Sequence, residues 1–110
     1  MLFLVELDRV NPGSTPTPES GRTFIEQVIF PTLDRAEQFA AEGTILSGGV
    51  VAGQVALRFI VEANSPEDVD RVVTSLPLWT VAETKVTPLI SFAERREHVK
   101  DLLDRISARA

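Results

Sequence analysis

Four charged side chains stand at positions where strands would bring them to one face of a sheet: Glu6, Arg58, Glu83 and Lys85. Successive side chains of a strand point to opposite faces, and the predicted sheet order places the strands of Arg58 and Lys85 on either side of the strand of Glu6. A carboxylate can carry a proton in acid–base catalysis, and an arginine can hold a ligand carboxylate. We therefore predict Glu6 as the catalytic residue and the other three as substrate-binding residues.

An ion-pair network between subunits is the alternative interpretation of the same four side chains. Buried charges are rarely unpaired, so Arg58 is expected to contact Glu6 or Glu83. In that case the set would stabilise an interface between two sheets and would bind no ligand. Both interpretations require the side chains to converge on the sheet face away from the helices.

The other residues with useful chemistry support fewer functions. Trp79, the sole tryptophan, is a candidate substrate-binding residue that would wall a pocket with Phe30 or Phe39; packing in the core or at an interface is the alternative. His98 is the sole histidine, and in a chain without cysteine it cannot build a typical zinc site. No metal or other cofactor is therefore expected.

Composition narrows the class of protein. The 110 residues carry a formal net charge of −5, and the eleven lysines and arginines are spread along the chain without the concentrated basic footprint that nucleic-acid binding leaves. The apolar N-terminus lacks a preceding basic region and is interrupted by Glu6 and Asp8, unlike a signal peptide. No stretch approaches the roughly 20 apolar residues of a membrane span. We expect a cytoplasmic protein that contacts neither membrane nor nucleic acid.

Apolar periodicity predicts strand, helix, strand, strand, helix, strand and a final helix. A break is expected at Phe30–Pro31, because proline removes a donor from a helix, and a strand bulge at Gly48–Gly49. Ser65, and Ser91 with Glu94 three residues later, predict the N-terminal caps of the last two helices. The predicted ranges are 2–8, 22–42, 44–52, 54–63, 66–75, 79–90 and 92–109, with a loop over 9–21.

This order of elements predicts an α+β, ferredoxin-like βαββαβ fold, in which an antiparallel sheet carries its helices on one face. The other face is half apolar and needs a cover, and a second copy of the sheet is the economical one. We therefore predict a single domain over 1–110 that forms a homo-oligomer, with a core over 1–90 and a helix over 91–110 that covers this face or reaches a partner. The residues expected on this face include Leu2, Leu4, Ala56, Ile60 and Val81.

The chain resembles the muconolactone isomerase family at three places. These are Met1-Leu2-Phe3, Glu42-Gly43-Thr44 and Leu76-Pro77-Leu78-Trp79. Element order and spacing match over about residues 1–90. The resemblance implies a dimeric α+β barrel and a cofactor-free isomerase that acts on a lactone.

The chain departs from this family at positions that bear on catalysis. The first strand of the family carries histidine and lysine where this chain has Leu4 and Glu6, and its first helix carries a glutamate near Thr32. A proton shift needs a positioned acid–base group, so we predict absent or very weak muconolactone isomerisation. We expect a small organic acid or lactone-like ligand and cofactor-free proton transfer; the alternative is a non-catalytic ligand-binding or oligomerisation module.

Overall fold

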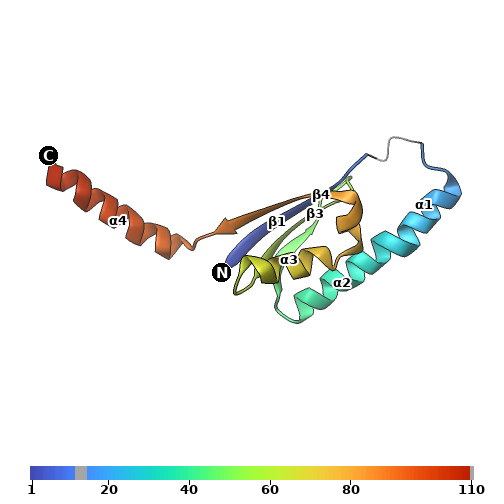
Figure 1. Cartoon of the computed structure of the whole chain (residues 1–110), viewed down its shortest axis with the longest axis horizontal. Coiled ribbons are helices and arrows are strands. Elements are labelled where there is room, and N and C mark those ends of the chain that lie inside the picture. The colour runs from blue at the N-terminus through green and yellow to red at the C-terminus, as the bar shows by residue number, and fades with distance from the viewer. Residues whose placement is uncertain (12–14, 110) are drawn as a thin grey trace.

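A computed structural model describes residues 1–11 and 15–109 and confirms the predicted fold class (Figure 1). Its four strands form one antiparallel sheet in the order β2-β3-β1-β4, with β1 in the interior. Residues 12–14 of the expected loop lie outside the described residues. The elements are β1 (Leu2–Arg9), α1 (Pro18–Phe24), the π-helical η1 (Ile25–Ile29), α2 (Phe30–Ala41), β2 (Ile45–Val50), β3 (Ala56–Glu62), α3 (Pro66–Thr74), the 3-10 helix η2 (Pro77–Val81), β4 (Ala82–Leu89) and α4 (Phe92–Arg109).

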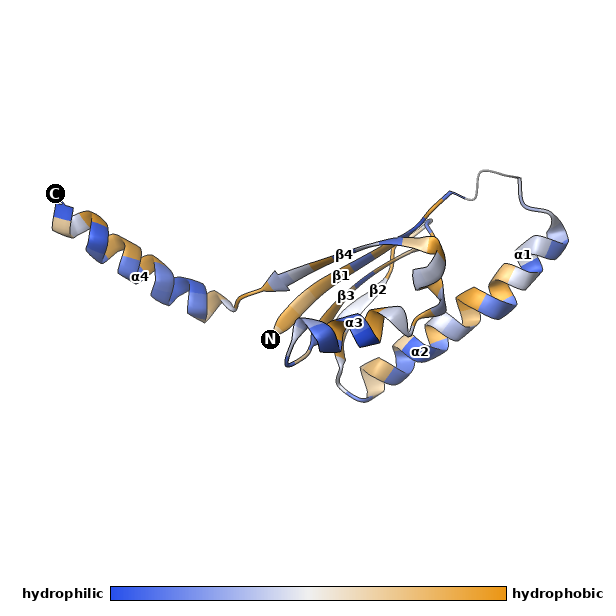
Figure 2. Ribbon diagram, viewed as in Figure 1, coloured by the Kyte–Doolittle hydropathy of each residue, from blue (hydrophilic) through white to orange (hydrophobic). Residues whose placement is uncertain are grey.

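The core lies between the sheet and the helices, as the strand alternation predicted. Every second residue of β1, and of β3 from Leu57 to Val61, is buried in the core with residues of α3 and η2. Ala56, expected on the open face, is also buried. Figure 2 shows β1 as predominantly hydrophobic. Each large apolar side chain removed from water contributes on the order of 1.5–3 kcal/mol to stability, so this layer holds the sheet in place. The main core residues are Phe3, Val5, Leu7, Leu57, Phe59, Val61, Val69, Val73, Leu76 and Leu78.

The first helix begins earlier than the sequence predicted. It starts at Pro18 instead of residue 22, because Thr17 accepts a hydrogen bond from the Ser20 backbone N–H at 3.1 Å and caps the first turn. Near Phe30–Pro31, where a break is expected, the π-helical η1 meets α2 without interrupting the helix, and the N–H of Phe30 donates to the carbonyl oxygen of Ile25. The wider turn precedes a proline that has no N–H of its own, so α1, η1 and α2 form one continuous helical rod (Figure 1).

Two sheet details correct the prediction. The pairing of β2 with β3 shifts between Ile45 and Ser47, so the bulge does not lie at Gly48–Gly49. The fourth strand begins at Ala82 rather than at residue 79, because Pro77 opens a 3-10 turn that includes Val81. Val81 therefore does not join the predicted row on the open face.

The caps of α3 and α4 form as predicted. Ser65 accepts from the N–H of Asp68 at 3.2 Å, and Ser91 accepts from the N–H of Glu94 at 3.0 Å. The α4 helix then extends away from the rest of the chain (Figure 1). The radius of gyration is consequently 18.8 Å, against roughly 13 Å for a compact domain of this length. None of the helices in the described part of the chain is both long and apolar enough to cross a bilayer.

Candidate functional site

Three of the predicted site residues form a row across the open face of the sheet. Glu6 on β1 is paired with Arg58 on β3 and with Lys85 on β4. Directly opposed side chains in antiparallel strands lie within contact distance of each other. The convergence expected from the sequence is therefore present, and we call Arg58, Glu6 and Lys85 the charged row.

Arg58 is the most constrained member of the charged row. Its Nε lies 3.3 Å from Oε1 of Glu6, and its Nη2 donates to Asp8 at 3.0 Å. Its Nη1 donates to the carbonyl of Leu57 at 2.9 Å. Most guanidinium N–H groups are thus engaged within the chain, so Arg58 positions carboxylates and has few donors left for a ligand. Sequence reasoning missed Asp8, although its spacing of two from Glu6 places it on the same face.

Lys85 is the cation of the charged row that has room for a ligand. Its side chain is exposed and forms no ion pair with any residue that the structure describes. Glu83 lies one row further along, opposite Asp8, and two carboxylates facing each other repel.

The part of the chain that the structure describes gathers no set of three histidine, aspartate or glutamate side chains suited to a metal ion.

An apolar surface adjoins the charged row on the same face. Leu4 and Ile60 are paired in the next row, and Leu2 is paired with Leu89 beyond it. These side chains are half-buried or exposed in the single chain. A small organic acid could therefore lay its carbon skeleton on Leu4 and Ile60 and direct its carboxylate toward Lys85.

Trp79 lies apart from this face. It is 41% exposed and lines a hollow on the helix side of the sheet with Phe3, Val69 and Val86. Phe30, expected as its neighbour, does not line that hollow and lines a different one, beside α1. The predicted substrate-binding set is therefore divided between the two faces of the sheet.

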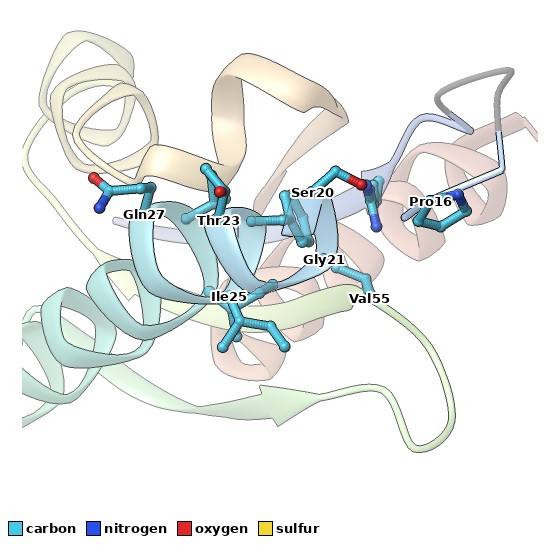
Figure 3. A pocket seen from close by; sticks show the side chains of 11 residues that line it. Pro16, Ser20, Gly21, Thr23, Ile25, Gln27 and Val55 are labelled. Atoms are coloured by element: carbon cyan, nitrogen blue, oxygen red, sulfur yellow. The ribbon is translucent and has the colours of Figure 1, made fainter. Parts of the chain in front are cut away.

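A second candidate site is a cavity of about 740 Å³ at the end of β1. Figure 3 shows its labelled lining residues coming from three segments: Pro16, the turns of α1 and η1, and Val55. The guanidinium of Arg9 stacks over the ring of Phe24 at 3.7 Å and is the cation in its wall. No carboxylate among the described residues lines it, so the cavity can attract an anion but offers no glutamate or aspartate to move a proton.

Comparison with known proteins places the chain in a family. The family model described as muconolactone delta-isomerase matches residues 1–95, a range that includes the charged row and the residues that line the cavity beside Arg9. The chain belongs to the muconolactone delta-isomerase family. No curated protein sequence matches it.

Two solved structures support the fold assignment. A muconolactone isomerase crystal structure superposes with a TM-score of 0.66 at 22% identity, covering 83% of this chain and 90% of that one. A 5-chloro-2-hydroxyhydroquinone dehydrochlorinase from Burkholderia phenoliruptrix AC1100, in complex with 2,5-dihydroxybenzoquinone, superposes with a TM-score of 0.61 at 23% identity, covering 86% and 98%. At these identities the likeness shows the fold alone. The chemistry of this muconolactone isomerase family member is therefore inferred from its own residues.

Thr32 shows how this family member differs near the expected glutamate position. Its side chain is 2% exposed, and its hydroxyl accepts a hydrogen bond from the N–H of Leu78 at 3.0 Å. This bond ties α2 to η2, the segment that carries the Leu-Pro-Leu-Trp sequence. Thr32 therefore supplies no carboxylate where the resemblance implied a glutamate, and the contact that the structure shows for its side chain links two elements.

Proposed function

We propose that the chain is a muconolactone-isomerase-like protein that binds a small organic acid or lactone on the open sheet face and transfers a proton there without a cofactor. The observation that carries the proposal is the charged row beside an apolar surface. Glu6 is paired with Arg58 at 3.3 Å on one side, and on the other side the strand register places it opposite Lys85, which stays unpaired among the described residues and available to a ligand.

In the proposed reaction, Lys85 pairs with the carboxylate or carbonyl oxygen of the ligand. The Glu6 carboxylate removes a proton from the carbon next to the carbonyl, and the electron pair of that C–H bond moves into an enolate. Glu6 then returns the proton to the far end of the conjugated system, so the double bond shifts and no atoms are lost. Arg58 and Asp8 position Glu6, and Glu83 borders the ligand.

A second copy of the chain is proposed to cover the site. Leu2, Leu4 and Leu89 leave an apolar area on the open face that one chain does not bury, and such an area favours association. Covering it would also exclude water from the charged row, which strengthens electrostatic interactions there.

Light scattering at micromolar concentration is expected to give a dimer or a multiple of one. The physical reason is the cost of leaving the apolar rows in water. A homogeneous species at the chain mass of 12.1 kDa would contradict the proposed assembly.

Muconolactone itself is expected to be a poor substrate, turned over at less than about 10 per second, the median for enzymes. The histidine, lysine and glutamate types of the family are replaced by Leu4, Glu6 and Thr32, and one well-placed acid–base group contributes about 10²–10⁴-fold. An ultraviolet assay of muconolactone consumption measures this rate. Faster turnover would show that Glu6 alone replaces the family's set.

A non-catalytic ligand-binding module is the second candidate function. The observation that favours it is the cavity of about 740 Å³ beside Arg9, which we call the Arg9 cavity. Among the described residues, its lining has one cation, mainly apolar walls and no carboxylate. Under this alternative, small aromatic acids would raise the melting temperature of the protein and remain unchanged during incubation. Chemical conversion of a bound acid or lactone by the purified protein would exclude it.

A further inference from the structure

The α4 helix carries an apolar stripe that its own chain leaves unpartnered. None of its residues is buried, and Phe92 is 98% exposed. Most of the stability of helices in proteins comes from tertiary packing of an amphipathic face, so a helix of 18 residues with an exposed apolar stripe is expected to pack on a surface. With 3.6 residues per turn, the members of this stripe share one face of the helix: Phe92, Val99, Leu102, Leu103 and Ile106.

An apolar groove of matching size lies between α2 and the edge strand β2, and we call it the α2–β2 groove. Two adjoining hollows of about 210 Å³ each share Leu33, Val50 and Leu57. Together they extend along the helical rod from Ile29 to Ala40, about 17 Å at 1.5 Å per residue. The whole stripe from Phe92 to Ile106 is about 21 Å long on the same scale, and its C-terminal part from Val99 to Ile106 about 10 Å. The groove therefore accommodates this C-terminal part.

The same chain cannot easily fill its own groove. The α4 helix follows β4, whereas the groove lies at β2, and these two strands are the opposite edges of the sheet. Ile90 and Ser91 alone connect β4 to α4. On the helix side, α3 lies over β1 and β4, since Val69 and Val86 line one hollow. A helix that started from β4 would therefore have to pass over α3.

The distribution of charge favours docking of α4 on the rest of a second copy, and disfavours pairing of two α4 helices. The α4 helix carries five basic and four acidic residues, whereas the rest of the chain carries six basic and twelve acidic ones. By helical spacing Arg95 lies on the same face of α4 as the stripe and Arg96 borders it. Glu37 lines the groove without an ion partner among the described residues. Pairing of two α4 helices would bring two net positive charges together. Docking of α4 on the rest of a second copy brings a net positive helix to a net negative chain.

From these observations we propose that α4 is an arm exchanged between two copies of the chain, with its stripe docked in the α2–β2 groove of the partner. This arrangement is compatible with the proposed stacking of the open sheet faces of two copies. A two-fold axis parallel to the strands places β4 of one copy beside β2 of the other. The exchange of α4 depends on the assembly and is independent of whether Glu6 transfers a proton.

The absence of cysteine allows a direct test by disulfide formation. One protein carries Leu103→Cys on the stripe and another carries Val50→Cys in the groove; the two are mixed and oxidised. A disulfide joining the two different chains, at twice the 12.1 kDa chain mass, is the expected result. Glu97→Cys, on the opposite side of α4, is the matched control and is expected to form at least tenfold less of the product with Val50→Cys.

Three outcomes would contradict the docking of α4 in the α2–β2 groove of a partner. If two Leu103→Cys chains formed a disulfide with each other in preference to one with Val50→Cys, then α4 would bind α4 of the other copy. A variant carrying both cysteines could close within one chain at high dilution, which would mean that α4 folds back. No excess over the Glu97→Cys control would mean that α4 does not reach the groove. Deletion of residues 92–110 checks the energetics without any cysteine, and is expected to raise the dissociation constant of the assembly at least tenfold.

Discussion

Replacement of Glu6 by glutamine is expected to slow proton transfer by about 10²–10⁴-fold, the contribution of one well-placed acid–base group. Glutamine keeps the size of the side chain and an oxygen that can still accept from Nε of Arg58, now at 3.3 Å, but it does not accept a substrate proton. The measurement is nuclear magnetic resonance of deuterium exchange at the carbon next to the lactone carbonyl of muconolactone, which reports the first half of the isomerisation even when full turnover is slow.

The matched control is Glu67→Gln, because Glu67 is an exposed carboxylate on α3, on the other side of the sheet. Its exchange rate is expected to equal that of the unmodified protein. Equal rates for Glu6→Gln and the unmodified protein would remove Glu6 from catalysis. If the unmodified protein did not raise the rate of deuterium exchange above the rate in buffer alone, the non-catalytic ligand-binding module would be favoured.

Gly48→Ala is expected to destabilise the fold by about 3 kcal/mol, since it combines backbone strain with overpacking. Gly48 has φ of 143°, and a Cβ there would lie 2.3 Å from the carbonyl oxygen of Arg58 and 2.5 Å from Cα of Phe59. Both neighbours are backbone atoms of β3, so relief requires β2 to move away from the sheet. For a domain of this size the loss corresponds to a fall in Tm of roughly 10–20 °C.

Gly49→Ala is the control for this prediction. A Cβ at Gly49 meets nothing within 4 Å, and surface changes of this kind are usually within about 0.5 kcal/mol. Thermal denaturation followed by circular dichroism compares the two variants. Equal Tm values would show that β2 adapts to the added carbon and that the close approach at Gly48 is unimportant.

The sequence predicted the sheet well because its signals there are local and periodic. Alternation in β1 and β3 separates Phe3, Val5 and Leu7 from Leu2 and Leu4, and a slip of one residue would reverse the two faces. Ser65 and Ser91 act on their own helix ends, so their caps could also be predicted. The strand order follows from the order of the elements, which brought Glu6, Arg58 and Lys85 together correctly.

Features that depend on tertiary contacts could not be predicted in the same way. The cap at Thr17 lies among prolines that indicate a loop. The bulge between Ile45 and Ser47 results from pairing with β3, although Gly48–Gly49 had the composition of a bulge; Gly48 is instead needed for close approach to Arg58 and Phe59. Trp79 follows a proline that opens a 3-10 turn, which moves it to the helix side.

The candidate site was predictable in composition but not in roles. The spacing of charges along strands places Glu6 and Arg58 on one face, but the choice of Arg58 contacts depends on side-chain rotamers. Its engagement with Glu6, Asp8 and the Leu57 carbonyl transfers the proposed ligand contact to Lys85. What covers the open face depends on a second molecule, and no pattern within one chain specifies its position.

The affinity for muconolactone, which carries a carboxylate group, is expected to differ sharply between Lys85→Met and Arg9→Met. A charge-assisted hydrogen bond contributes about 1.5–3 kcal/mol, so binding at the charged row predicts that Lys85→Met raises the Kd by about 10–150-fold while Arg9→Met leaves it within about twofold. Isothermal titration calorimetry gives both values. A Kd unchanged in Lys85→Met and raised in Arg9→Met would place the ligand in the cavity beside Arg9 and would contradict binding at the charged row.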